Sequence, residues 1–187
     1  MAVGSRIGHL NVVKGLDQLT LAEHSTLGRL NWVSGLPLDS GSGHFSLESH
    51  RVPSLVLGEH SAVTSRHLLD YNAAVEIGRY ATVAGSRSQI LSHTISIAHS
   101  RQTSAPVRIG HYCFVGTGCI VLPGVELPSY SVLGAGSVLN KTYSEEFTFY
   151  AGSPARPIRA IDRSSDYFHR EIGFVVWCPE SDIRSQY

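Results

Sequence analysis

The 187-residue chain carries 15 basic and 15 acidic residues, so its formal net charge at neutral pH is zero. A chain with this balance lacks the basic footprint of a nucleic-acid or anionic-lipid binder, and we expect neither partner. Its three cysteines have no CxxC spacing, which argues against a disulfide framework or a zinc knuckle. Neither a signal-like leader nor a stretch of membrane-spanning length is evident, so we expect a cytoplasmic protein with no membrane span.

Turn-forming and core-forming residues are both abundant: 18 glycines and 8 prolines stand beside 42% hydrophobic residues. Disordered glycine-rich chains are less apolar than this. The combination predicts many short strands separated by frequent turns.

A seven-residue phrase recurs along the chain, as LTLAEHS, LVLGEHS, VEIGRYA and VRIGHYC. Leu21 in the first copy and Leu57 in the second are 36 residues apart, which we interpret as two coils of about 18 residues. Ile77 follows after 20 residues and Ile109 after a further 32. We therefore expect a coil with protruding loops at about 35–53 and 89–106.

The last part of this coil shows the repeat most regularly. An aliphatic residue returns at every sixth position, at Ile109, Val115, Val121, Leu127, Leu133 and Leu139. An amphipathic helix would need apolar spacings of three and four. A period of six instead predicts a short strand and a tight turn in each repeat, with three repeats closing one triangular coil. The predicted fold is an all-β parallel β-helix, in which the thiols of Cys113 and Cys119 are buried.

The segment VRIGHYCFVGTGCIVLPGVELPSYSVLGAGSVL, followed by YAGSPARPIRAI, resembles the C-terminal coils of the hexapeptide-repeat acyltransferases. These are sugar and polysaccharide O-acetyltransferases, and the resemblance covers about residues 7–161. It implies a left-handed β-helix, an exception to the usual right-handed crossover. It also implies an O-acetyltransferase that uses acetyl-CoA as acyl donor and a carbohydrate as acceptor, and that forms a homotrimer. We expect a β-helix domain at 1–161 and a C-terminal capping tail at 162–187, covering the last coil or a neighbouring subunit.

His93 is the candidate general base. It lies where the ladder breaks at Gln89 and a loop leaves the coil, and in the resembling enzymes a histidine in such a segment removes the proton of the acceptor hydroxyl. An imidazole suits this task because its ordinary pKa lies near neutral pH. His99, six residues later, is a competing base. His24, His60 and His111 are interpreted as solvent-facing repeat positions.

Four residues are candidates for substrate binding. His67 and Asp70 precede His93 by about one coil, so they could approach it in space; Asp70 could orient the imidazole, bind the acceptor or stabilise a turn. Arg101 and Gln102 close the loop and could bind substrate hydroxyls.

The resemblance also implies a groove between subunits for coenzyme A. Backbone at turns would contact the pantetheine arm, and cationic side chains would meet the phosphates. The residues carried over are Gly116, Gly134, Ala135 and Gly136 for the arm, and Lys141, Arg156 and Arg159 for the phosphates.

Two alternatives remain open. A β-helix that serves only as an assembly scaffold would show the same repeat. The γ-type carbonic anhydrases share the fold and hold zinc with three histidines, two of them in a G-H and H-G-C pattern. Here Gly110-His111 is followed at that spacing by Gly116, so one ligand is missing, and we expect no metal.

Overall fold

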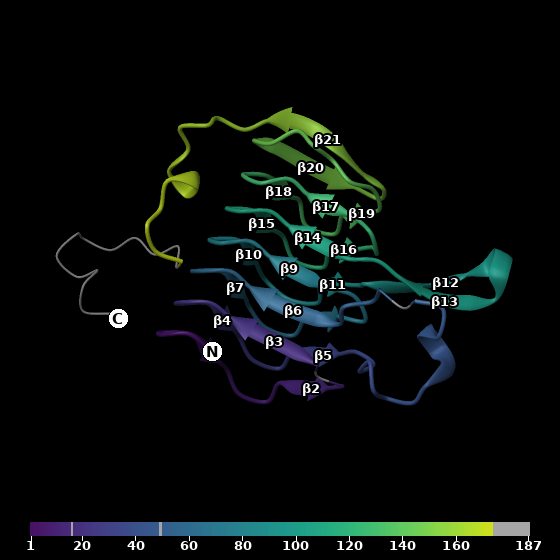
Figure 1. The fold of residues 1–187 in the computed structure, drawn as a ribbon. Coiled ribbons are helices and arrows are strands. Elements are labelled where there is room, and N and C mark those ends of the chain that lie inside the picture. The colour runs from purple at the N-terminus through teal and green to yellow at the C-terminus, as the bar shows by residue number, and fades with distance from the viewer. Residues whose placement is uncertain (16, 49, 174–187) are drawn as a thin grey trace.

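The computed structural model describes residues 1–15, 17–48 and 50–173. Short strands wind into a stack of coils, and three sheets run along the sides of the stack (Figure 1). Sheet A contains β1 (Arg6–Ile7), β4 (Thr26–Leu27), β7 (Ala62–Val63), β10 (Thr82–Val83), β15 (Phe114–Val115), β18 (Val132–Leu133), β20 (Thr148–Gly152) and β21 (Ala155–Ala160). Sheet B contains β2 (Val12–Lys14), β5 (Trp32–Ser34), β8 (Leu68–Asp70), β11 (Gln89–Ile90), β16 (Ile120–Val121) and β19 (Val138–Leu139). Sheet C contains β3 (Gln18–Leu21), β6 (Ser54–Leu57), β9 (Val75–Ile77), β14 (Val107–Ile109) and β17 (Glu126–Leu127).

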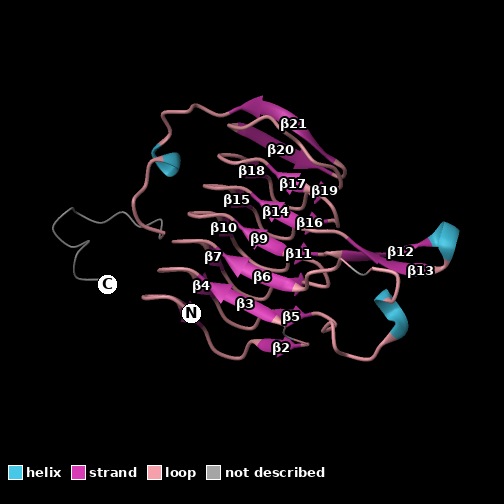
Figure 2. Ribbon diagram, in the orientation of Figure 1, coloured by secondary structure: helices cyan, strands magenta, loops and turns pink. Residues whose placement is uncertain are grey.

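Neighbouring strands within these sheets pair in parallel, except for the antiparallel pair β20 and β21. Helical structure in the described residues is limited to three short 3-10 turns, η1 (Gly43–Phe45), η2 (Ile97–His99) and η3 (Asp166–Phe168) (Figure 2). The six-residue ladder points inward, and each of its aliphatic side chains is at most 2% exposed. The predicted all-β architecture with parallel sheets is therefore confirmed.

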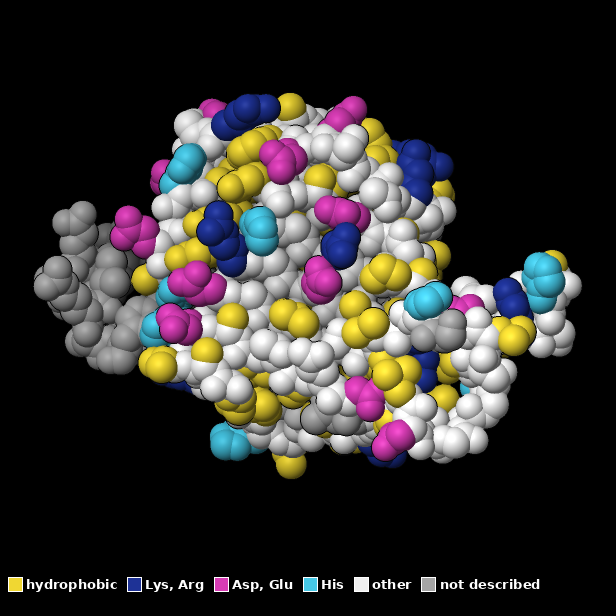
Figure 3. Space-filling model, viewed as in Figure 1, with side chains coloured by type: hydrophobic (Ala, Val, Ile, Leu, Met, Phe, Trp, Pro, Cys, Tyr) yellow, Lys and Arg dark blue, Asp and Glu magenta, His cyan; other side chains and the backbone are white. Residues whose placement is uncertain are grey.

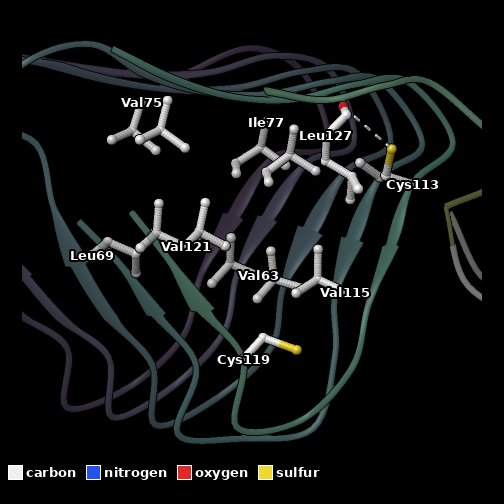
Figure 4. Packing of buried hydrophobic residues seen from close by; sticks show 14 of the residues in the cluster. Val63, Leu69, Val75, Ile77, Cys113, Val115, Cys119, Val121 and Leu127 are labelled. Carbon is white, nitrogen blue, oxygen red and sulfur yellow. Dashed lines mark hydrogen bonds between the residues drawn. The ribbon is translucent and has the colours of Figure 1, made fainter. Parts of the chain in front are cut away.

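Cys113 and Cys119 lie in the core among these aliphatic residues, as predicted (Figure 4). Burial raises the pKa of the Cys113 thiol to about 12, so it stays protonated at neutral pH. The third cysteine, Cys178, lies outside the described residues.

The structure corrects the interval between Leu21 and Leu57. β3 pairs directly with β6, with Leu21 beside Leu57, so the interval holds one coil and one excursion, not two coils. The excursion is the predicted loop at about 35–53, which contains η1. The period alone could not separate the two readings, because this excursion is about as long as a coil.

The second excursion begins later than predicted. Gln89 and Ile90 form β11, which stays in sheet B between β8 and β16. The chain leaves the coil at an antiparallel hairpin made of β12 (His93–Ser96) and β13 (Arg101–Ser104). This hairpin projects from the stack on the side away from the C-terminal segment (Figure 2).

Turns join the sheets along three edges of the stack. The A–B edge comprises residues 8–11, 28–31, 64–67, 84–88, 116–119 and 134–137. The B–C edge carries both excursions, and its turns include residues 71–74 and 122–125. The C–A edge comprises residues 22–25, 58–61, 78–81, 110–113 and 128–131.

The C–A edge carries a column of stacked rings. Consecutive ring centroids lie 4.6 to 5.4 Å apart, in the order His24, His60, Tyr80, Tyr112, Tyr130 and Phe147. The spacing between adjacent coils, about 4.8 Å, suits ring stacking. The solvent-facing interpretation is therefore wrong for His60, whose side chain is 11% exposed. His111, two residues after Ile109 rather than three after an aliphatic position, lies outside the column and is exposed.

The described part of the C-terminal segment packs along this column. Phe168 meets Tyr130 and Phe147 edge-on, at centroid distances of 5.9 and 5.4 Å. Arg170 donates a hydrogen bond to the backbone carbonyl of Tyr80, and its own carbonyl accepts from the Tyr112 hydroxyl at 3.3 Å. Residues 162–173 thus lie beside the coils. Residues 174–187 of the predicted tail fall outside the described residues.

Candidate active site

His93 and Asp70 form a hydrogen-bonded pair at the B–C edge. Asp70 ends β8, one coil before His93, which begins the hairpin. The ring nitrogen Nδ1 of His93 bonds to the carboxylate oxygen Oδ2 of Asp70. Asp70 is buried, whereas the His93 side chain is 37% exposed. The structure shows the predicted approach of Asp70 to His93, with the carboxylate bonded to the ring.

The Asp70 carboxylate accepts hydrogen bonds from two chain segments, the turn after β8 and the start of the hairpin. Oδ2 accepts the backbone N–H groups of Ser92 and His93, each at 3.2 Å. Oδ1 accepts the backbone N–H of Asn72 at 3.1 Å and also its side-chain amide. Burial raises the pKa of Asp70, but the hydrogen bonds from His93 and Asn72 outweigh burial and lower it overall. Asp70 is thus an anion at neutral pH.

This anion fixes the tautomer of the imidazole. An ionised carboxylate only accepts hydrogen bonds, so Nδ1 of His93 must carry the proton that it shares with Asp70. The Asn72 amide nitrogen lies 3.1 Å from the same Nδ1 but donates to Asp70, because its own oxygen accepts from Leu36 N–H at 2.9 Å. In the neutral ring the lone pair is therefore on Nε2.

The hydrogen bond that His93 donates to Asp70 raises the pKa of His93 above its ordinary value; burial opposes this shift and the charge of Asp70 adds to it. Beside the ring lies a hollow of about 440 Å³. Besides the Asp70 carboxylate, its walls combine apolar and uncharged polar side chains, among them Ser34, Phe45, Leu68, Gln89, Leu91 and Gln102. An imidazole with an available Nε2 at the rim of such a hollow can remove a proton from a bound hydroxyl.

The first excursion forms one wall of this site. Phe45 meets the His93 ring edge-on at a centroid distance of 6.0 Å. The Arg51 guanidinium lies 4.6 Å from the centre of the Phe45 ring and donates to the carbonyls of Leu36 and Asn72, at 2.5 and 3.1 Å. Glu48 accepts from the backbone and hydroxyl of Ser104 on the hairpin, at 3.4 and 3.3 Å. The two excursions are therefore held together around His93.

His67 does not belong to this site, contrary to the prediction that it binds substrate. It lies on the A–B edge and is 2% exposed. Its Nε2 is 2.9 Å from the Thr64 hydroxyl, and its Nδ1 accepts from Ser88 N–H at 3.2 Å. Burial lowers the pKa of His67 to about 4. Both ring nitrogens are hydrogen-bonded within the coil, so neither is available to a substrate.

The hairpin residues divide between two places. Gln102 lines the hollow beside His93, whereas Arg101 lines a neighbouring hollow of about 340 Å³ towards the hairpin tip, and Gln102 borders that one too. His99, the competing base, lies in η2 at the tip, and its Nδ1 is 3.0 Å from the Ser96 hydroxyl. It does not line the hollow that His93 lines.

The predicted coenzyme A residues are spread over different parts of the surface. Gly116, Gly134, Ala135 and Gly136 lie on the A–B edge. Ala135 and Gly136 are exposed, and a side chain at Gly116 would collide with the backbone of Ala135 at 2.7 Å. Lys141 lies near the B–C edge over Tyr143, while the exposed Arg156 and Arg159 lie on β21. The arm residues and His93 thus lie on two different edges of sheet B.

Sequence reasoning missed Asn72, Phe45 and Arg51. Asn72 stands two residues after Asp70, a spacing typical of a turn in which the carboxylate accepts the later N–H. That spacing could have identified it. Phe45 and Arg51 approach His93 only through the fold of the first excursion, and nothing in the repeat indicates it.

Among the described residues, no group of three or more His, Cys, Asp or Glu side chains is arranged to hold a metal ion. In the same part of the chain, no helix has the length and apolarity needed to cross a membrane.

Comparison with known proteins agrees with the fold. No model of a protein family matches the chain. A segment covering 36% of it is 36% identical, over 69 residues, to 34% of the galactoside O-acetyltransferase of Escherichia coli. The chain spans about a third of the length of the curated relatives it matches, 34% to 37% for two of them.

Two solved structures share the fold. A maltose O-acetyltransferase of Clostridium difficile 630 superposes with a TM-score of 0.56 at 23% identity, over 86% of this chain and 71% of that one. A hexapeptide-repeat acetyltransferase of Vibrio cholerae, solved with acetyl coenzyme A, gives 0.55 at 19%, over 86% and 72%. The galactoside and maltose enzymes are O-acetyltransferases of sugars, and the Vibrio cholerae protein is a hexapeptide-repeat acetyltransferase. The resemblance predicted from the sequence is therefore confirmed.

Proposed function

We propose that the protein is an acyl-CoA-dependent O-acyltransferase, with acetyl-CoA as donor and a carbohydrate hydroxyl as acceptor. The observation that carries the proposal is the pair of His93 and buried Asp70 at the rim of the hollow. The acetyltransferases similar to this chain support the reaction class, and two of them are O-acetyltransferases of sugars. The proposal includes a left-handed β-helix over residues 1–161 and a C-terminal capping tail at 162–187.

The proposed reaction uses the lone pair of His93 Nε2. Nε2 removes the proton of the acceptor hydroxyl while its oxygen attacks the carbonyl carbon of the thioester. The tetrahedral intermediate then collapses, the carbon–sulfur bond breaks, and the imidazolium returns the proton to the departing sulfur. Asp70 holds the ring in the required tautomer and stabilises the imidazolium, as the aspartate does in serine-hydrolase triads. A backbone N–H of a neighbouring turn would stabilise the oxyanion.

The outward rows of the sheets differ in a way that supports a homotrimer. In sheet B the row reads Val12, Trp32, Leu68, Gln89, Ile120 and Val138. In sheet C it reads Thr20, Val56, Glu76, Arg108 and Glu126, and Figure 3 shows acidic and basic side chains side by side over that face. A largely apolar face is the better candidate for burial between subunits.

We therefore place sheet B towards the threefold axis. In that arrangement the A–B edge of one subunit meets the B–C edge of the next, since both edges border sheet B. The pantetheine arm would lie on Gly116, Gly134, Ala135 and Gly136 of one subunit and present its thioester to His93 of the other. Lys141, Arg156 and Arg159 remain the proposed contacts of the coenzyme A phosphates, while Gln102 and Arg101 remain proposed acceptor contacts.

The test measures thiol release from acetyl-CoA with a panel of glycan acceptors. His93→Ala should lower turnover at least about 10³-fold, since it removes the base and the proton donor to sulfur. His99→Ala is the matched control, a histidine of the same hairpin outside the hollow, and it should keep parental turnover. Equal turnover in His93→Ala and the parent would refute the role of His93. No thiol release with any acceptor would favour a scaffold, and light scattering would test the trimer.

A further inference from the structure

The A–B edge differs from the other two edges in its charge. Its described turns contain three arginines, at Arg29, Arg66 and Arg87, and no aspartate or glutamate. The B–C edge contains Asp70, and the C–A edge contains Glu23. The ion pairs found in the described residues involve none of the three arginines. This edge therefore presents positive charge that the protein itself does not neutralise.

The arginines lie on consecutive coils. Arg66 N–H donates to the carbonyl of Arg29 at 3.0 Å, and Arg87 N–H donates to the carbonyl of Arg66 at 2.9 Å. Adjacent coils are about 4.8 Å apart, so the turns of this arginine row follow one another at a spacing that two linked phosphates can bridge. Arginine suits this task because its planar fork binds phosphate oxygens in pairs.

A hollow of about 630 Å³ opens beside this row. Its lining combines guanidinium, hydroxyl, imidazole and apolar groups, from His9, Leu10, Arg29, Leu30, Ser65, Arg66 and Ser86. Ser65 Oγ accepts from Arg29 N–H at 3.3 Å, which leaves its own hydrogen free to be donated to an anion. The exposed side chains of Leu10 and Leu30 add an apolar surface. The lining suits a ligand that has both an anionic and an apolar part.

The height of the row along the stack indicates which substrate it serves. Arg87 precedes β11 and His93 follows it, so both belong to one coil. Arg66 and Arg29 lie on the two preceding coils, whereas Gly116 and Gly134 lie on the two that follow. Where two subunits share a groove, the thioester arm therefore approaches the level of His93 from the glycine side. The acceptor has to enter from the arginine side.

We propose that the hollow and the arginine row bind a diphosphate carried by the acceptor, so that the acyl acceptor is a diphosphate-linked sugar such as a nucleotide sugar. This proposal rests on the proposed acyl transfer and on the shared groove. The diphosphate would anchor the acceptor on the A–B edge of one subunit, and its sugar hydroxyl would reach His93 of the next.

Isothermal titration of the full-length protein tests the site without any turnover, with UDP, inorganic pyrophosphate and coenzyme A as separate probes. We expect UDP to bind the parent protein, and Arg66→Gln to weaken it about tenfold, the usual value of one charge-assisted hydrogen bond. The double variant Arg29→Gln/Arg66→Gln should weaken it about 100-fold. Arg79→Gln is the matched control, an exposed turn arginine of the C–A edge, and should bind UDP like the parent.

Pyrophosphate should lose affinity in the same variants, and coenzyme A should bind the double variant as tightly as the parent. Absence of UDP binding to the parent, or unchanged UDP affinity in the double variant, would overturn the proposal. A parallel loss of UDP and coenzyme A affinity would overturn it too, because the row would then hold the phosphates of the donor. Failure of acyl transfer in the thiol-release assay leaves these titrations unaffected, so the two proposals can fail separately.

Discussion

The C–A edge and the B–C edge are built from the same repeat but stabilised in opposite ways. On the C–A edge, one ring per coil stacks on the next, and the described C-terminal segment lies over the column. On the B–C edge the coil is interrupted twice, and the interruptions enclose a buried carboxylate that accepts five hydrogen bonds from three residues. The regular edge produces a continuous column of stacked rings, and the irregular edge produces the hollow beside His93.

The difference has a physical cause. A buried carboxylate requires several hydrogen-bond donors at fixed positions. The turn of a six-residue repeat has too few free N–H groups to supply them. Asp70 obtains them because Asn72 follows it in a turn and because Ser92 and His93 begin the hairpin. We therefore expect catalytic groups where the coil is interrupted, and contacts that only stabilise the fold where the coil is regular.

The most severe test of this comparison removes the charge of Asp70. In Asp70→Asn, we expect turnover to fall about 10²- to 10⁴-fold, since the ring loses the acceptor that fixes its tautomer. The hydrogen bond to Asp70 raises the pKa of His93, so the variant's pKa should be lower. In the parent, turnover should fall as pH drops through the raised pKa of His93, and in the variant this fall should move to lower pH. Turnover measured against pH checks both effects.

Asn72→Ala separates orientation from charge, because it keeps the carboxylate and removes only the side-chain amide that supports it. It should lower turnover by less than Asp70→Asn and leave the acid limb closer to that of the parent. An Asp70→Asn variant that keeps parental turnover and an unshifted acid limb would contradict the orienting role of Asp70.

The sequence predicts the regular parts of the coil better than the interrupted B–C edge. The inward ladder from Ile109 to Leu139 and the buried Cys113 and Cys119 follow from a period of six, because every sixth side chain meets the same environment. The same reasoning can predict the aromatic column, provided that the register of each ring is counted: His60 stands three residues after Leu57, whereas His111 stands two after Ile109. The contacts that Phe45 and Arg51 make at the site could not be predicted from the repeat. They depend on how the first excursion, about as long as one coil, folds back on the stack.

The second test compares two histidines whose pKa values are shifted in opposite directions. Burial lowers the pKa of His67 to about 4, below its ordinary value of 6.5. Its neutral form stabilises the fold fully above pH 6.5, and this stability is lost as pH falls from 6.5 towards 4. The loss at pH 4.5 is about 2 kcal/mol. The pKa of His93 is raised, so its contribution instead is present below pH 6.5 and disappears as pH rises through the raised value.

Urea unfolding of the parent and of His67→Gln at pH 7.5 and pH 4.5 measures this effect. The stability difference between parent and variant should shrink by about 2 kcal/mol at the lower pH. His99→Gln, at the exposed hairpin tip, controls for the loss of an imidazole outside the core. An equal difference at both pH values would mean that His67 is not held neutral by burial.

The third test breaks the aromatic column on the other edge. Tyr112→Ala removes two ring contacts, to Tyr80 at 4.6 Å and Tyr130 at 5.4 Å, and a hydrogen bond to the carbonyl of Arg170. We expect the free energy of unfolding to fall by about 1–2 kcal/mol, because the ring is only partly buried. Turnover per folded molecule should not change. Tyr112→Phe, which keeps the stack, should cost less than half as much; a loss of turnover in folded Tyr112→Ala would couple the two edges.

The smallest effect concerns the contact that holds the two excursions together. Glu48 accepts from Ser104 N–H and from its hydroxyl at 3.4 and 3.3 Å, distances at which each bond is weak. Glu48→Ala should therefore cost less than about 1 kcal/mol of stability. The hairpin and the first excursion border the hollow, so loosening them should raise the KM for the acceptor a few-fold while kcat stays near the parental value. The Asp70–His93 pair joins the end of β8 to the base of the hairpin, and neither residue takes part in the Glu48–Ser104 contact. A large fall in kcat would instead show that the excursions position the base itself, and that the irregular edge acts as one unit.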